Sequence, residues 1–104
     1  MSILIRGGEI VTDSKRFVAD IFCKGETITA IGQNLTAPEG ATVIEAKGKY
    51  VFPGFIDPHV HIYLPFMGAF AKDTYETASR AALVGATTTP VSYTHLTLPT
   101  IYSV

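Results

Sequence analysis

The chain has 104 residues, of which 47% are apolar and 16% are charged, and its net charge is −1. This length suits one small domain, and a charge so near zero gives no reason to expect a nucleic acid or an anionic membrane as partner. No apolar run is long enough to cross a bilayer, and the first residues lack the features of a secretion signal. The only cysteine, Cys23, cannot form an internal disulfide. We therefore expect a cytoplasmic protein in which Cys23 is a small buried side chain.

The first half of the sequence predicts short β-strands. Apolar residues on both sides of Gly7-Gly8 predict two strands joined by a turn. "KGE" at residues 24–26 predicts a hairpin turn between strands at 18–23 and 27–32. Residues 41–52 predict another strand pair, or a bend, around Gly48. Together these features predict a small antiparallel β module.

The second half predicts a strand, a loop, a helix and a second strand. Residues 53–64 begin with a Pro-Gly break and predict one buried strand. Residues 72–86 predict a helix with Asp73 as its N-cap, Glu76 three positions later as in a capping box, and Gly85 at its end. A new strand is expected from residue 86. This βαβ order predicts parallel pairing, and a single such unit cannot complete a parallel sheet.

The last fourteen residues, 91–104, differ from the rest of the chain. They contain no Asp, Glu, Lys or Arg, and they place Pro99 in a β-rich stretch. Residues 91–100, "VSYTHLTLPT", resemble the translation of a transposase-type sequencing adaptor. We therefore expect a non-native tail, and we give His95, which lies within it, no functional role.

A pair of histidines, His59 and His61, stands in the predicted strand. Alternate residues of a strand share a face, so Asp57, His59, His61 and Tyr63 are expected on one face, with aliphatic residues on the other. Residues two apart on a strand lie roughly 6.5–7 Å apart, which lets two imidazoles converge on one metal ion. The same pattern also occurs by chance as surface or core filler. Its position at the end of a strand that opens a βα series favours a functional site.

These residues carry a family likeness. "PGFIDPHVH", residues 53–61, resembles the first-strand motif of the metal-dependent amidohydrolase superfamily, and the continuation to Thr89 resembles dihydropyrimidinases and hydantoinases. The resemblance implies an α/β parent protein, a (β/α)8 barrel with a small N-terminal β-sandwich. Residues 1–52 would belong to the sandwich, residues 53–90 would form the first strand–helix unit of the barrel, and residues 91–104 would be the tail.

The resemblance also implies a chemistry. Family members hold two divalent ions, usually zinc, at the mouth of the barrel and open cyclic amides to N-carbamoyl amino acids. His59 and His61 match two ligands of one ion. Asp57 is expected to act behind the ligands or simply to make a hydrogen bond at the strand end. Leu64 and Phe66 are expected to contact the substrate or merely to pack on the barrel rim.

The other ligands of the family, a carboxylated lysine, two histidines and a catalytic aspartate, come from later strands. No lysine follows Lys72, so we expect this chain alone to be inactive, and no catalytic residue is assigned. The parent is expected to be a homotetramer acting on a small-molecule substrate. Alternatives are an allantoinase or dihydroorotase, a non-catalytic dihydropyrimidinase-related scaffold, and a free-standing β module whose histidines only pack.

Overall fold

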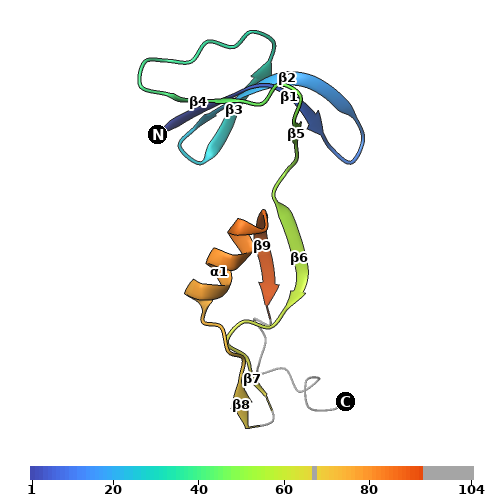
Figure 1. The fold of residues 1–104 in the computed structure, drawn as a ribbon, viewed down its shortest axis with the longest axis vertical. Coiled ribbons are helices and arrows are strands. Elements are labelled where there is room, and N and C mark those ends of the chain that lie inside the picture. Colours follow the sequence, from blue (N-terminus) through green and yellow to red (C-terminus); the bar gives the residue numbers. More distant parts are fainter. Residues whose placement is uncertain (67, 93–104) are drawn as a thin grey trace. The chain divides into compact units, whose positions relative to one another are not determined.

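The computed structural model describes residues 1–66 and 68–92 (Figure 1). The chain divides into two compact units, Met1–Pro53 and a second unit that begins at Gly54. Each unit is described by itself below.

The N-terminal unit is a five-stranded sheet in the order β3-β2-β1-β4, and β5 also pairs with β1. Its strands are β1 (Ser2–Val11), β2 (Arg16–Lys24), β3 (Thr27–Gly32), β4 (Thr42–Glu45) and β5 (Tyr50–Val51). The hairpin predicted at 24–26 is present, since β2 and β3 pair in antiparallel register. The prediction of a wholly antiparallel module is wrong, because β4 and β5 both run parallel to β1. β4 and β5 do not pair with each other around Gly48. Instead, both pair with β1, which at ten residues is long enough for the two to follow one another along it.

The predicted turn at Gly7-Gly8 is instead a bulge inside the continuous strand β1. Ile5 pairs with Ile21, whereas Gly8 pairs with Ala19, so the register shifts between them. Gly7 has a φ of 69°, which glycine adopts without strain. A Cβ at Gly8 would lie 2.5 Å from a methyl carbon of Val51. The two glycines thus let β1 bend and let β5 approach closely.

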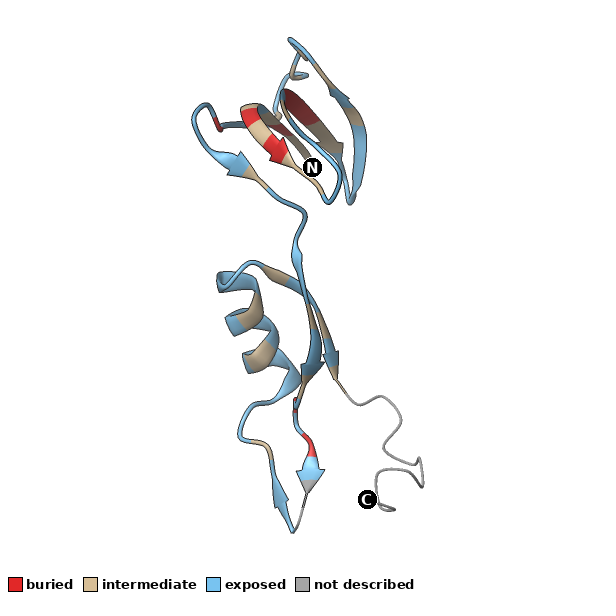
Figure 2. Ribbon diagram, turned by 90° about the vertical axis from the view of Figure 1, so that its right-hand side faces the viewer, coloured by how far each residue is buried: buried red, intermediate tan, exposed pale blue. Residues whose placement is uncertain are grey.

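The apolar core lies in the N-terminal unit, where Figure 2 shows most of the buried residues. Ile10, Ala19 and Ile21 form its centre, and Leu4 is fully buried. Cys23 is only partly buried and packs against this cluster, so the expectation of a buried thiol holds in part.

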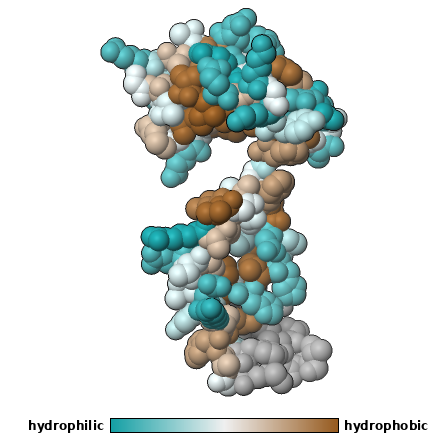
Figure 3. Space-filling view, in the orientation of Figure 1, coloured by the Kyte–Doolittle hydropathy of each residue, from teal (hydrophilic) through white to brown (hydrophobic). Residues whose placement is uncertain are grey.

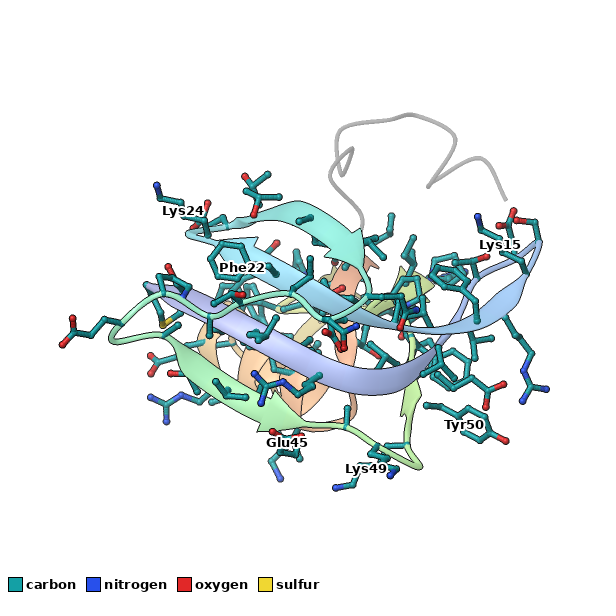
Figure 4. The ribbon with its side chains drawn as sticks, turned by 90° about the horizontal axis from the view of Figure 1, so that it is seen from above. Lys15, Phe22, Lys24, Glu45, Lys49 and Tyr50 are labelled. Carbon is teal, nitrogen blue, oxygen red and sulfur yellow. The ribbon has the colours of Figure 1, made fainter. Side chains whose placement is uncertain are left out.

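Charged side chains pair along the exposed rim of the same sheet. Figure 4 shows Lys15 and Lys24 at opposite ends of β2. Arg16 lies 2.8 Å from a carboxylate oxygen of Glu9 and 5.3 Å from the ring centre of Tyr50. The hydrogen bond and the charge of Glu9 raise the pKa of the Arg16 guanidinium further above its usual range. Such exposed pairs contribute little to stability.

The second unit contains the predicted βαβ arrangement. Its elements are β6 (Phe55–Val60), β7 (Pro65–Phe66), β8 (Ala69–Phe70), α1 (Tyr75–Val84) and β9 (Thr87–Ser92). β6 and β9 pair in parallel, as predicted, and α1 packs against β9. The loop expected after the first strand contains the short antiparallel hairpin β7–β8. β9 extends to Ser92, two residues into the stretch expected to be the tail.

The N-cap of α1 is Thr74, so the prediction of Asp73 as the cap is wrong. The Thr74 hydroxyl accepts a hydrogen bond from the Thr77 N–H, and the Thr77 hydroxyl accepts one from the Thr74 N–H, which completes a capping box. The carbonyl of Asp73 accepts a hydrogen bond from the Tyr63 N–H at 3.0 Å, which holds Asp73 outside the helix. Gly85 is the C-cap, as predicted.

The second unit buries little apolar surface. Among its described residues only Ile62 and Leu64 are buried hydrophobic side chains, and α1 has no buried residue. Figure 3 shows hydrophobic surface among hydrophilic residues in both units. In the part of the chain that the structure describes, no helix is long and apolar enough to span a membrane.

Candidate metal centre

His59 and His61 lie together at the carboxyl end of β6. His59 is the fifth residue of the six-residue strand, and His61 directly follows the strand. Their Nε2 atoms are 3.2 Å apart, and their ring centres are 5.3 Å apart with an angle of 36° between the planes. The predicted pair is therefore brought together, with the same nitrogen of each ring facing the other.

This spacing matches the geometry of two ligands on one metal ion. Two nitrogens bound to zinc at about 2.0–2.1 Å in tetrahedral geometry lie roughly 3.3 Å apart. The observed 3.2 Å between the Nε2 atoms agrees with that value. Neutral imidazole also supplies the donor atom that Zn²⁺ prefers near neutral pH. The separation of the two Nε2 atoms is thus compatible with two ligands of one divalent ion.

Asp57 lies close to the pair but contacts the main chain. Its Oδ1 accepts a hydrogen bond from the His59 N–H at 3.1 Å. Asp57 is half-buried, whereas both histidines are exposed in this chain. Its contact is therefore of the kind expected at a strand end, and it involves the backbone of a candidate ligand.

The strand predicted over residues 53–64 ends earlier, at Val60. Ile62 donates its N–H to the Ser92 hydroxyl at 3.3 Å rather than to a strand carbonyl. Tyr63 has a φ of 47°, a left-handed conformation that turns the chain away from β6. The expectation that Tyr63 continues the face of the histidines is therefore wrong. Nothing in the alternating pattern of residue types indicates this turn.

The two candidate substrate-loop residues lie in the segment that follows. Leu64 is 8% exposed, and its carbonyl accepts a hydrogen bond from the Ala71 N–H across the β7–β8 hairpin. Phe66 is in β7, and its side chain lies outside the described part of the structure. The sequence did not indicate the ring stack between Tyr63 and Phe70, whose centres are 5.3 Å apart and whose side chains are both more than half exposed. The only feature of the sequence that relates to this stack is the number of aromatic residues in the loop.

The described residues contain only part of a metal site. Within residues 1–66 and 68–92, no group of three or more histidine, cysteine, aspartate or glutamate side chains gathers around one point. His95 lies outside the described residues. The pair therefore needs ligands from elsewhere to complete a tetrahedral or larger coordination shell.

Comparisons with known proteins place this geometry in context. No family model matches the chain. A solved D-hydantoinase (dihydropyrimidinase) from Thermus sp. shares 68% identity and a TM-score of 0.82 over 86% of this chain and 20% of that one. The D-hydantoinase of Geobacillus stearothermophilus is 45% identical over 93 residues, which are 89% of this chain and 20% of that protein. The human dihydropyrimidinase-related protein 5 is 43% identical over 86 residues, covering 83% of this chain and 15% of the relative.

The chain thus spans about a fifth of the length of these two D-hydantoinases. The expected fold class is confirmed: the chain contains strands of the N-terminal β domain and the first βα unit of the barrel. The sequence resemblance, the histidine pair and the agreement with solved structures all lead to the same family. The chain matches the N-terminal region of D-hydantoinases and dihydropyrimidinases, and its sequence and structure are consistent with a fragment of this family.

Proposed function

We propose that the protein containing this chain hydrolyses cyclic amides, namely dihydropyrimidines and 5-substituted hydantoins, to N-carbamoyl amino acids. His59 and His61 act as two ligands of one of two divalent zinc ions. The observation that carries the proposal is the 3.2 Å separation of the two Nε2 atoms at the carboxyl end of β6. In barrels of this class, that end of the strands carries the catalytic groups.

The residues of this chain contribute binding and orientation. The two imidazoles bind through Nε2, which requires both rings to be neutral and the proton of each ring to reside on Nδ1. Divalent ions in such a site lower the pKa of water and polarise the carbonyl of the amide. Leu64 and Phe66 present an apolar loop to the exocyclic group of the substrate. The bridging lysine, two further histidines and the proton-shuttling aspartate come from the remainder of the protein, so this chain alone is inactive.

The proposal extends to the setting of the protein. The full-length protein is a cytoplasmic homotetramer that takes small cyclic substrates and neither nucleic acid nor membrane. Residues 91–104 are a non-native tail derived from a sequencing adaptor. The test of the tail is to amplify and sequence the genomic locus without that library chemistry; a locus that still encodes "SYTHLTLPT" refutes it.

Metal analysis of the purified full-length protein tests the function. About two zinc ions per subunit by plasma mass spectrometry, together with ring opening of dihydrouracil and hydantoin, is the expected result. Ring opening of allantoin or dihydroorotate alone would assign the protein to another cyclic amidohydrolase. The 43% identity to dihydropyrimidinase-related protein 5 makes a non-catalytic scaffold the second candidate, and absence of both metal and hydrolysis would favour it.

A further inference from the structure

Asp57, Pro58 and His59 form a local turn within strand β6. The Oδ1 atom of Asp57 accepts a hydrogen bond from the N–H two residues later, at 3.1 Å, with Pro58 between the two residues. This is the Asx-turn arrangement, in which a short side chain takes the place of a main-chain acceptor. The bond ends on the main chain of His59 and not on its imidazole ring.

The turn coincides with an irregularity in the pairing of β6 with β9. Asp57 pairs with Pro90 and Val60 pairs with Ser92, so in this chain three steps along β6 correspond to two steps along β9. β6 therefore contains one extra residue, which is a β-bulge. Ser92 belongs to the stretch proposed as a non-native tail, so the feature expected to persist in the full-length protein is the hydrogen bond from the His59 N–H to Asp57. Pro58 and Pro90 both lack an N–H and cannot donate to the ladder at this point. The Asp57 carboxylate supplies an acceptor for the His59 N–H where the regular ladder is interrupted.

The bulge lies where the direction of the ligands is set. A bulge bends its strand and re-aims the side chains beside it. His59 is in the bulged segment and His61 is just beyond it, so the separation of their Nε2 atoms depends on the backbone conformation at Pro58 and His59. The hydrogen bond to Asp57 ties that conformation to a side chain of the same turn.

We propose that Asp57 is a positioning residue for the metal pair, and that it acts as a hydrogen-bond acceptor for the His59 main chain rather than through its charge. The inference rests on the proposed function, because it assumes that His59 and His61 bind a metal ion. A different arrangement is common in metal sites: a carboxylate accepts the ring N–H of a ligand histidine and makes that ligand more basic. If Asp57 acts as an acceptor for the main chain, replacing it with an uncharged acceptor keeps the metal affinity. If it acts through its charge, the same replacement lowers the affinity.

The experiment compares Asp57→Asn, Asp57→Ser and Asp57→Ala in the full-length protein after its metal has been removed. Competition with a chromophoric chelator measures the affinity for Zn²⁺ alone, and the visible spectrum of the Co²⁺ form reports the ligand geometry. We expect Asp57→Asn and Asp57→Ser to keep the zinc affinity within about threefold. Asp57→Ala should lower it by about tenfold or more, which is the usual effect of removing a group that hydrogen-bonds a metal ligand. Asp13→Ala, in the turn between β1 and β2, is the matched control and should leave the affinity unchanged.

The outcomes separate the two proposals. If the unsubstituted protein binds no zinc, the proposed function fails and this inference fails with it. If it binds zinc but Asp57→Asn lowers the zinc affinity as much as Asp57→Ala does, the charge of Asp57 is required and the positioning role is wrong. An Asp57→Ala variant that binds Zn²⁺ as tightly as the unsubstituted protein would also refute the positioning role. Should Asp57→Ala fail to fold, Asp57→Asn and Asp57→Ser decide alone, and the exchange rate of the His59 amide in these two metal-free variants is expected to match that of the unsubstituted protein.

Discussion

The side chain of Thr88 in β9 fills the space that a Cβ at Gly54 would need. A Cβ built on Gly54 lies 2.7 Å from the Thr88 Cβ and still closer to the hydroxyl and methyl of that side chain. Phe55 follows at once and donates its N–H to the Ala86 carbonyl at 2.9 Å. The glycine of the "PGFID" stretch is therefore required where β6 begins to pair with β9, at the opposite end of the strand from the histidines.

Gly54→Ala is expected to destabilise the full-length protein by about 1–3 kcal/mol, the usual cost of inserting a carbon atom into a packed position. Thermal denaturation would show this as a lower Tm. Gly85→Ala is the control, because the nearest atoms to its added Cβ are carbonyl oxygens at 3.5 and 3.7 Å, which is ordinary contact. Equal Tm values for the two variants would contradict the role of close approach at Gly54. Combining Gly54→Ala with Thr88→Gly should recover part of the loss.

Asp20 holds together two parts of the N-terminal unit, and its variants should rank in a fixed order. This buried carboxylate accepts the Gly7 N–H on Oδ1 at 2.8 Å and the Leu35 N–H on Oδ2 at 3.0 Å. Asp20→Ala leaves both donors without this acceptor and should cost about 2–6 kcal/mol, at about 1–3 kcal/mol per unsatisfied buried group. Asp20→Asn retains one acceptor oxygen and should fall between wild type and Ala in urea denaturation. An Asn variant as stable as wild type would show that one of the two bonds contributes nothing.

The two units of the isolated chain should differ in local stability. Leu4, Ile10 and Ile21 are buried in the N-terminal sheet, whereas Leu83 and Val84 on α1 are 63% and 90% exposed. Because slow amide exchange requires buried, cooperatively packed structure, we expect amides of β1 and β2 to exchange at least about tenfold more slowly than those of α1. Hydrogen exchange followed by NMR measures this directly. Uniform protection and one sharp two-state melt of the monomeric chain would contradict it.

The sequence predicted what depends on local residue chemistry. The hairpin at 24–26, the helix end at Gly85 and the parallel βαβ unit follow from turn residues and periodicity, and the structure contains all three. The parallel pairing of β4 and β5 with β1 was not predicted, because strand partners depend on contacts between distant residues rather than on local pattern.

The candidate site divides in the same way. The approach of His59 and His61 follows from their spacing and is present. The left-handed turn at Tyr63 and the bulge after Asp57 depend on where β9 and Asp73 offer partners, which residue types alone do not reveal. The same cause displaced the helix cap by one residue, since Asp73 uses its carbonyl to hold the Tyr63 N–H.

The corrected cap gives a direct comparison of two neighbouring residues. Thr74→Ala removes the hydroxyl that accepts the Thr77 N–H and should cost about 1 kcal/mol, the usual value for loss of an N-cap. Asp73→Ala removes only a carboxylate that accepts from the Thr77 hydroxyl, and it should cost less. Urea denaturation of the full-length protein gives both values. A larger loss in Asp73→Ala would return the cap to Asp73.

The metal pair itself predicts non-additive loss of binding. If His59 and His61 hold the same ion, either substitution to Gln already removes one of the two bonds that fix it, and the second substitution has little left to remove. Each single variant of the full-length protein should therefore lose about one zinc ion per subunit, and the double variant should lose no more. Glu76→Gln, an exposed helix position whose carboxylate pairs with Arg80, is the control and should keep the full metal content. Stepwise loss, with one ion missing in each single variant and two in the double, would mean that the histidines serve different ions, and the 3.2 Å contact between their Nε2 atoms would then be only a packing arrangement.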